Sequence, residues 1–294
     1  MNKKNLVTLI NSIILVSILT VSFTGTVIAS PYLNINVQRV RRMVLRNCSS
    51  NLVILDLRSE SMYMSGHIPG AINVPVLPPP PDWTVLENWI NSDEGQSHLN
   101  DKIIVHCLAG LASPSAANML ETAGFTRVYN MEGGFNAWIA AGYNIEIAVT
   151  HSGVGISSSP PTDSWSIGGD PPKFTIWKGS TVTIATLTLT IHSNPAEILV
   201  GSGYSEICGI TQFTETGSIV YHLANGVWTF PGGTFEGKYV YIVTKPTPSP
   251  FTWTFRMIRC VLYGTGDFEG QKLLMSYDGP MIGASWTGFL YKSP

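Results

Sequence analysis

The sequence predicts an α/β domain with a central parallel sheet and flanking helices, followed by an all-β domain that is an antiparallel barrel or sandwich. A chain of 294 residues is long enough for two domains that each bury a core. Apolar runs alternate with helical segments up to about residue 147, whereas strict two-residue alternation dominates after residue 173. Only 12% of the residues are charged, and the 28 Gly and 19 Pro favour short strands and turns over long surface helices.

The first element is an uncharged apolar stretch, residues 6–29, which follows Lys3 and Lys4. A basic start followed by an apolar run and small residues such as Ala29 is typical of an export signal. The stretch is also about long enough to span a bilayer without being cleaved. We therefore expect residues 1–30 to be a signal peptide or an N-terminal anchor. The rest of the chain is then exported, either secreted or held on the outer face of the cytoplasmic membrane.

Residues 31–150 are expected to form the α/β domain. The pattern predicts, in chain order, a helix over 37–46, a strand over 52–55, a helix over 83–90, a strand over 103–105 and a helix over 114–123. Short β-branched runs separated by helical segments are typical of parallel strands joined by crossover helices.

The remaining residues divide into a linker and the all-β domain. Residues 151–172 are rich in Ser, Gly and Pro and show little apolar periodicity, which predicts an interdomain linker. Residues 173–294 alternate Thr with aliphatic residues, which predicts strands with one buried face. A Gly-x-Phe-x-Gly pattern at 233–237 recurs at 266–270 and predicts two similar hairpins. The ligand of this domain stays open.

Charge and cysteine content exclude several classes of function. With 17 Lys and Arg against 19 Asp and Glu, the chain lacks the basic footprint of a nucleic-acid-binding protein. None of the four cysteines has CxxC spacing, so we expect no metal site and no other cofactor. Cys208 and Cys260 both lie in the all-β domain of an exported chain, and we expect them to form a disulfide.

The candidate chemistry lies at Cys107, directly after a predicted buried strand. Residues 107–113, here called the Cys107 loop, lead into a helix with Ser113 as its expected N-cap and Pro114 at its first position. Such a loop can turn successive N–H groups inward, and the helix adds the positive end of its dipole. Both effects lower the pKa of a thiol and favour nucleophilic sulfur chemistry. The alternative is an inert cysteine buried at a strand end.

Four motifs in consistent order resemble the signatures of a rhodanese-like domain over about residues 35–147. They are Leu-Asp-Leu-Arg at 55–58, Gly-His-Ile-Pro-Gly-Ala-Ile-Asn at 66–73, the Cys107 loop, and Glu-Gly-Gly-Phe-Asn-Ala-Trp at 132–138. The resemblance implies a thiol that accepts sulfane sulfur from a donor such as thiosulfate and holds it as a persulfide. It implies Cys107 as the nucleophile and an anion-binding loop made of Leu108, Ala109, Gly110, Leu111, Ala112 and Ser113. Asp56, Arg58 and His67 are the implied supporting residues.

The Cys107 loop also departs from the family pattern. Active members usually carry Arg at the positions that Leu108 and Ala112 occupy here. Backbone amides replace a bidentate guanidinium only partly, so weak affinity for thiosulfate is expected, and a polysulfide or small persulfide fits better. The related phosphatase pattern requires Arg where Ser113 stands, which disfavours phosphate-ester hydrolysis.

Three functional interpretations follow from the sequence. The first is an exported sulfurtransferase that forms a persulfide on Cys107 and passes the sulfur to a thiol or cyanide-like acceptor. The second is a catalytically silent rhodanese-like binding module joined to a β-barrel domain that binds a ligand or a surface. The third gives the main role to the all-β domain. Membrane anchoring through residues 6–29 is compatible with each of them.

Overall fold

A computed structural model describes residues 32–46, 51–169, 173–215, 217–246, 254–280 and 286–293. The expected signal segment, residues 1–30, and Cys48 lie outside the described residues. Among the helices of the described ranges, none is both long and apolar enough to cross a membrane.

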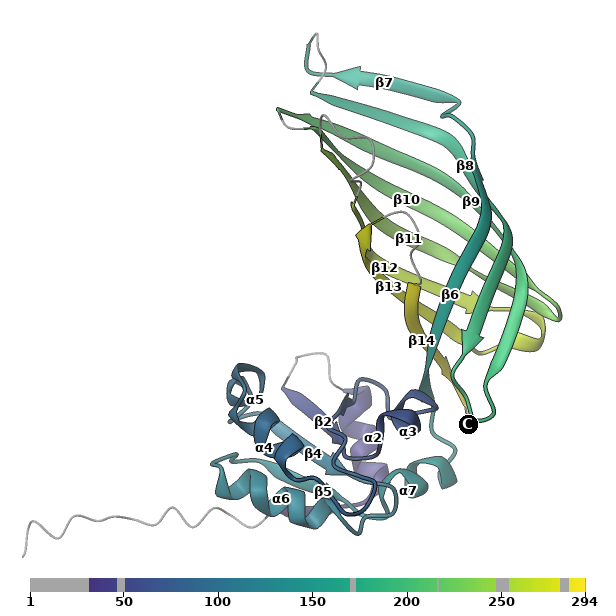
Figure 1. Cartoon of the computed structure of the whole chain (residues 1–294). Helices are drawn as coiled ribbons and strands as arrows, with labels where there is room; N and C mark the ends of the chain where they lie inside the picture. The colour runs from purple at the N-terminus through teal and green to yellow at the C-terminus, as the bar shows by residue number, and fades with distance from the viewer. Residues whose placement is uncertain are drawn as a thin grey trace, which may run out of the picture. The chain divides into compact units, whose positions relative to one another are not determined.

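The first part of the described chain is built on a parallel sheet of five strands in the order β1-β5-β4-β2-β3 (Figure 1). All four strand pairings are parallel. The predicted central parallel sheet is therefore confirmed. The strands are β1 (Leu33–Ile35), β2 (Leu52–Asp56), β3 (Ile72–Asn73), β4 (Lys102–His106) and β5 (Val128–Met131).

Helices pack on both faces of this sheet. They are α2 (Val37–Leu45), α3 (Glu60–Met64), α4 (Thr84–Asn91), α5 (Asp93–Ser97), α6 (Ser113–Thr122) and α7 (Gly134–Ala140). Alternate strand residues divide between two cores: Ile54 and Ile104 join the core that includes α2 and α7, whereas Leu55 and Val105 join the core that includes α4 and α6. Because both faces are buried, β2 and β4 are nearly continuous apolar runs. Their carboxyl ends carry the polar and reactive residues.

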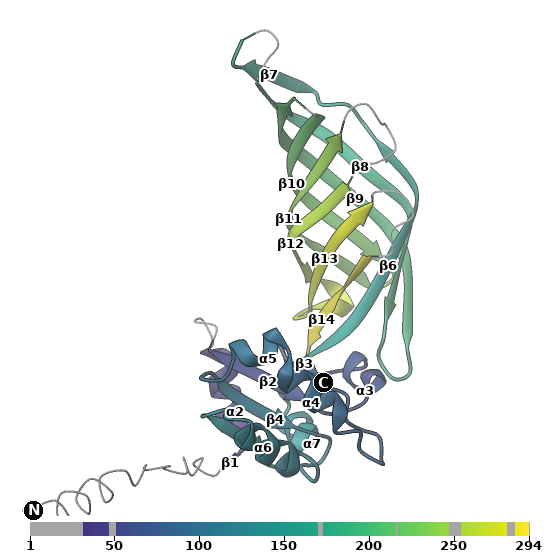
Figure 2. The same ribbon diagram turned by 60° about the vertical axis from the view of Figure 1, so that its left-hand side comes forward.

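The second part is an antiparallel sheet of nine strands in the order β6-β14-β13-β12-β11-β10-β9-β8-β7. Strand β6 pairs with β14 and also with β8, so all strands except β7 form a closed ring (Figures 1 and 2). The strands are β6 (Ile145–Ser158), β7 (Asp163–Ile167), β8 (Phe174–Ile191), β9 (Glu197–Thr214), β10 (Gly217–Phe230), β11 (Gly233–Pro246), β12 (Thr254–Gly264), β13 (Lys272–Pro280) and β14 (Trp286–Lys292). Large apolar side chains such as Leu189, Trp228 and Phe235 are buried in its core. The predicted all-β antiparallel domain is confirmed.

The segment expected to be a linker is largely strand. Residues 151–158 form the second half of β6, and Asp163–Ile167 form β7. The backbone from His151 to Ser158 pairs with β8, from Leu189 to Val182. Backbone pairing does not require apolar side chains on the strand, so the weak apolar periodicity of this segment was a poor guide.

The expected disulfide between Cys208 and Cys260 is not formed, and both thiols are free. Cys208 lies on β9 and Cys260 on β12, with β10 and β11 between them. Neighbouring strands are about 4.8 Å apart, so three steps across the sheet far exceed the roughly 7 Å limit of a disulfide. Cys208 is also exposed, whereas Cys260 is buried.

The two Gly-x-Phe-x-Gly segments do not form similar hairpins. The first begins β11, and the second contains a 3-10 turn over Gly266–Phe268. The segments instead contact each other, because Phe235 and Phe268 stack with ring centroids 4.9 Å apart.

Candidate active site around Cys107

Cys107 directly follows β4, which pairs with β5 on one side and with β2 on the other. The thiol therefore lies at the carboxyl edge of the sheet, where α/β proteins usually place their ligands. Cys107 is only 2% exposed, so a substrate has to reach a sulfur that is almost enclosed.

The environment of the sulfur favours the thiolate. Burial by itself raises the pKa of the Cys107 thiol, but the backbone N–H groups of Ala112, Ser113 and Gly110 and the Ser113 hydroxyl lower it. The net effect is a pKa below the ordinary thiol value. Backbone N–H groups and a hydroxyl that favour the anionic form of a thiol activate its sulfur as a nucleophile.

Ser113 is not the N-cap that the sequence predicted. Helix α6 begins at Ser113, and the residue at its N-cap is Ala112, which makes no side-chain capping bond. The buried Ser113 hydroxyl instead lies 3.8 Å from the Cys107 sulfur. The helix thus begins without a side-chain cap, and the Ser113 hydroxyl contacts the Cys107 sulfur instead.

The amino end of α7 holds the Cys107 loop through backbone hydrogen bonds. The backbone N–H of Phe135 donates to the carbonyl of Cys107 at 2.8 Å, and that of Asn136 donates to the carbonyl of Leu108 at 2.9 Å. Gly134 has φ +55°, and a Cβ at this position would overlap the Cys107 carbonyl oxygen. The Gly-Gly-Phe motif was visible in the sequence, but its role in supporting the loop becomes evident only from these contacts.

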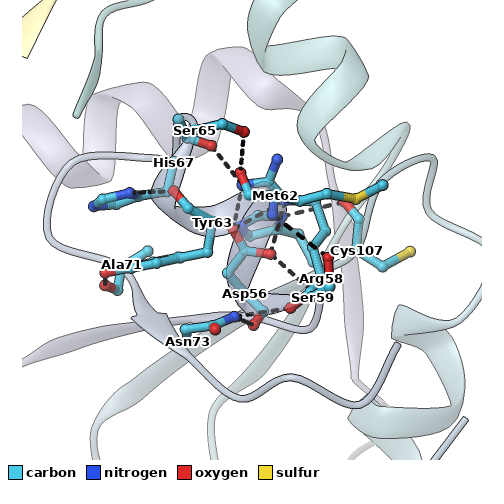
Figure 3. A network of polar contacts seen from close by, with 12 residues as sticks. Asp56, Arg58, Ser59, Met62, Tyr63, Ser65, His67, Ala71, Asn73 and Cys107 are labelled. Atoms are coloured by element: carbon cyan, nitrogen blue, oxygen red, sulfur yellow. Dashed lines mark hydrogen bonds and ion pairs between the residues drawn. The ribbon is translucent and has the colours of Figure 1, made fainter. Parts of the chain in front are cut away.

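Asp56 and Arg58 form a buried ion pair beside the loop (Figure 3). Arg58 Nη2 lies 2.6 Å from Asp56 Oδ2 and also donates to the Gly66 carbonyl at 2.7 Å. The guanidinium lies over the Phe135 ring, 3.7 Å from its centroid. Burial raises the pKa of Asp56, but the imidazole of His106 and the guanidinium of Arg58 outweigh it and hold that pKa below its usual value.

His106 connects this pair to the backbone of the nucleophile. Its Nδ1 lies 3.2 Å from the Cys107 carbonyl oxygen, and its Nε2 lies 3.8 Å from Asp56 Oδ2. Burial lowers the pKa of His106 more than the carboxylate of Asp56 raises it. In Figure 3 the Cys107 sulfur points away from Asp56 and Arg58. Asp56, Arg58 and His106 therefore position the strand ends.

His67 lies on the other side of the ion pair from Cys107 in Figure 3. Its Nδ1 is 2.9 Å from the Tyr63 carbonyl oxygen, and its Nε2 is 3.5 Å from the Glu146 carboxylate. Its ring stacks on Tyr63 and meets Phe289 edge-on. These contacts join α3 to β6 and β14, which is a structural role.

The outer rim of the Cys107 loop is apolar. Leu108 is 38% exposed, Leu111 is 88% exposed, and Ala109 is also exposed. Leu108 and Ala112 occupy the two positions at which active members of the family usually carry Arg. The structure thus brings Gly110, Ala112 and Ser113 to the sulfur and leaves Leu108, Ala109 and Leu111 facing outward.

Comparison with known proteins identifies relatives of the α/β domain. Residues 40–141 match the family model of the rhodanese-like domain. Thiosulfate sulfurtransferase GlpE of Pseudoalteromonas translucida is 36% identical over 92 residues, which are 31% of this chain and 76% of GlpE. GlpE of Shewanella oneidensis is 31% identical over 99 residues, which are 34% of this chain and 87% of that protein.

Two solved structures are also similar to this chain. A rhodanese-like domain from Anabaena is 28% identical and aligns with 40% of this chain and 80% of its own, with a TM-score of 0.32. A human single-domain sulfurtransferase is 22% identical and aligns with 38% of this chain and 96% of its own, with a TM-score of 0.31.

The lowered pKa of Cys107 gives a first prediction. Alkylation of Cys107 by iodoacetamide has a pH midpoint below the ordinary thiol value of about 8.5, because the thiolate is the reacting form. Ser113→Ala removes one donor and moves the midpoint upward by up to about 1 pH unit. Ser115→Ala, an exposed serine on the same helix, leaves it unchanged. Peptide mass spectrometry follows the reaction. Equal midpoints in wild type and Ser113→Ala would contradict the role given to this hydroxyl.

The close approach of α7 gives a second prediction. Gly134→Ala displaces the Cys107 loop and lowers stability by about 1–3 kcal/mol, because the position combines positive φ with a steric overlap. Gly142 is the matched control, since its φ is +67° and a Cβ added there would have no other atom within 4 Å. Both variants lose stability in thermal unfolding, but only Gly134→Ala changes the alkylation midpoint of Cys107. The same midpoint in both variants would show that the contact does not shape the loop.

Proposed function

This chain belongs to the rhodanese-like domain family, and from that premise we propose that it is an exported sulfurtransferase that carries sulfane sulfur as a persulfide on Cys107. The observation that carries the proposal is the environment of the Cys107 sulfur, where the Ser113 hydroxyl lies 3.8 Å away and the backbone N–H groups of the loop help to hold the thiol pKa below its ordinary value. Donors so placed stabilise both a thiolate and the terminal sulfur of a persulfide anion. Export rests on residues 6–29, whose pattern is that of a signal or anchor.

The reaction consists of two nucleophilic displacements at sulfur. The Cys107 thiolate attacks the terminal sulfane sulfur of the donor. A new S–S bond forms, the S–S bond between that sulfur and the rest of the donor breaks, and the donor leaves with the bonding electron pair as a thiolate or a polysulfide one sulfur shorter. A thiolate or cyanide-like acceptor then attacks the outer sulfur of the persulfide, and Cys107 leaves as a thiolate. A low pKa makes Cys107 a good leaving group in this second step, and the sequence of steps needs no external oxidant.

The donor we propose is a polysulfide or a small persulfide. Thiosulfate carries two negative charges, and Leu108 and Ala112 offer it no guanidinium. The sulfur is nearly enclosed and the rim is apolar, which suits a slender donor that brings only one charged sulfur atom to the thiol. Backbone donors suffice for one sulfur anion but compensate a dianion only in part.

A second candidate is a silent binding module that uses the same loop. The observation in its favour is Leu111, which is 88% exposed beside the nucleophile and offers an apolar contact to a partner. This alternative keeps the fold but forms no persulfide, so a direct test of sulfur transfer separates the two.

The direct test is persulfide formation. After incubation with sodium polysulfide and removal of excess donor, the intact protein gains one sulfur atom that a reductant releases. Cys107→Ala loses this gain, while Cys208 remains present and reports any non-specific adduct. A wild-type protein that acquires no sulfur at Cys107 would favour the silent module and contradict the proposed activity.

Donor choice gives a further prediction. Leu108→Arg combined with Ala112→Arg raises thiosulfate turnover at least about tenfold, equivalent to about 1.4 kcal/mol of transition-state stabilisation, because two charge-assisted donors meet the dianion. Polysulfide turnover changes much less. Turnover with each donor is measured at a fixed acceptor concentration, with thermal unfolding to confirm equal folding. No gain with thiosulfate in the folded double variant would refute the charge argument.

A further inference from the structure

A second candidate binding site lies at the amino end of the parallel sheet. It is a cavity of about 310 Å³, and four of its lining residues are the cations Arg39, Arg42, Arg46 and Lys102. Lys102 begins β4, whereas Cys107 follows the end of that strand. At about 3.3 Å per residue, the two ends are on the order of 16 Å apart. A ligand in this cavity therefore does not touch the thiol.

The cations converge on the cavity from two elements. Arg39 and Arg42 lie on one face of α2, three residues apart, and Arg46 follows four residues later as the C-cap of the helix. Lys102 comes from β4, whose first backbone N–H donates to the Asn51 carbonyl at 3.0 Å. Asn51 also lines the cavity. The three arginines are exposed and Lys102 is half-buried, so a ligand from solution can reach them.

Helix electrostatics explain only part of this cluster. The negative end of the α2 dipole favours Arg42 and Arg46 near the carboxyl end. Arg39 lies in the first turn, where the dipole disfavours a cation, although its guanidinium lies over the Tyr129 ring, 5.9 Å from the centroid, and Lys102 is not on the helix. Within the described part of the chain, none of the four has a carboxylate at ion-pair distance. The cluster is therefore an excess of positive charge in a chain whose net charge is −2.

We propose that this cavity binds a soluble oligophosphate. Guanidinium forks match the geometry of phosphate oxygens, and four cations call for a ligand with several negative charges. The volume is within the range of small-molecule sites, and a concave site encloses a small anion better than a flat membrane surface. Met43 and Leu52 supply an apolar wall, which limits the water that competes for the anion.

The test is isothermal titration calorimetry of the full chain with inorganic triphosphate at low ionic strength. Wild type binds saturably with one ligand per chain, and the affinity falls as salt rises because the contacts are charged. Arg42→Gln combined with Arg46→Gln weakens binding at least tenfold. Lys102→Gln, which leaves α2 intact, also weakens it, so the result does not depend on the stability of the helix.

Arg41→Gln is the matched control. Arg41 belongs to the same helix and carries the same charge, but its guanidinium lies over the Tyr143 ring, 4.4 Å from the centroid, and it does not line the cavity. Its affinity for triphosphate stays within about twofold of wild type, since only the general charge of the surface changes. Persulfide formation at Cys107 is unaffected in every variant, which keeps this test independent of the proposed sulfurtransferase activity.

Three results would overturn the proposal. One is the absence of saturable triphosphate binding to folded wild type. Another is an equal loss of affinity in Arg41→Gln, which would show a diffuse charge effect. The third comes from sedimentation with phosphatidylglycerol vesicles. If the Arg42 and Arg46 double variant lost vesicle binding while wild type bound no triphosphate, the cluster would be a membrane-facing surface.

Discussion

A buried sulfur anion must be surrounded by hydrogen-bond donors, because removing a charge from water costs several kcal/mol unless the protein replaces the lost solvation. In the α/β domain, the residues around Cys107 meet this requirement. The donors come from the backbone of Gly110, Ala112 and Ser113 and from the Ser113 hydroxyl. A loop can aim several N–H groups at one point only if its own carbonyls are held elsewhere. The amino end of α7 supplies that hold by donating to the carbonyls of Cys107 and Leu108.

The same constraint applies to the second set of buried charges. Asp56 and Arg58 are both buried, and each satisfies the other through a bidentate contact. Arg58 extends the network to the Gly66 carbonyl and the Phe135 ring. Asp56 is in register with His106, the residue before Cys107. The ion pair holds the ends of β2 and β4 in place, because either charge would be costly to leave unpaired. The Cys107 loop begins at the end of β4 that is held in this way.

The all-β domain satisfies its polar groups by a different route. Its strands are paired into a closed ring by the contact of β6 with β8, which leaves few open edges for other chains. The core is mainly apolar, with Leu187, Leu189 and Phe235 fully buried, but it also buries His151 and Ser205. A domain that satisfies its backbone in this way needs few charged residues, which is consistent with a chain of only 12% charged residues.

The sequence by itself determined the elements whose signals are local and the position of the proposed nucleophile. The apolar runs at β2 and β4 and the helical periods of α2, α4 and α6 were recognised because each depends on neighbouring residues. Cys107 was recognised from its place between a strand and a helix, together with the order of the family motifs.

Only the tertiary structure decided how distant segments meet. It turned the Ser113 hydroxyl to the sulfur, placed Gly134 against the Cys107 carbonyl and brought Lys102 to the arginines of α2. It also made residues 151–158 a strand and separated Cys208 from Cys260. Contacts between distant segments depend on strand order and register, and a local residue pattern does not specify either of them.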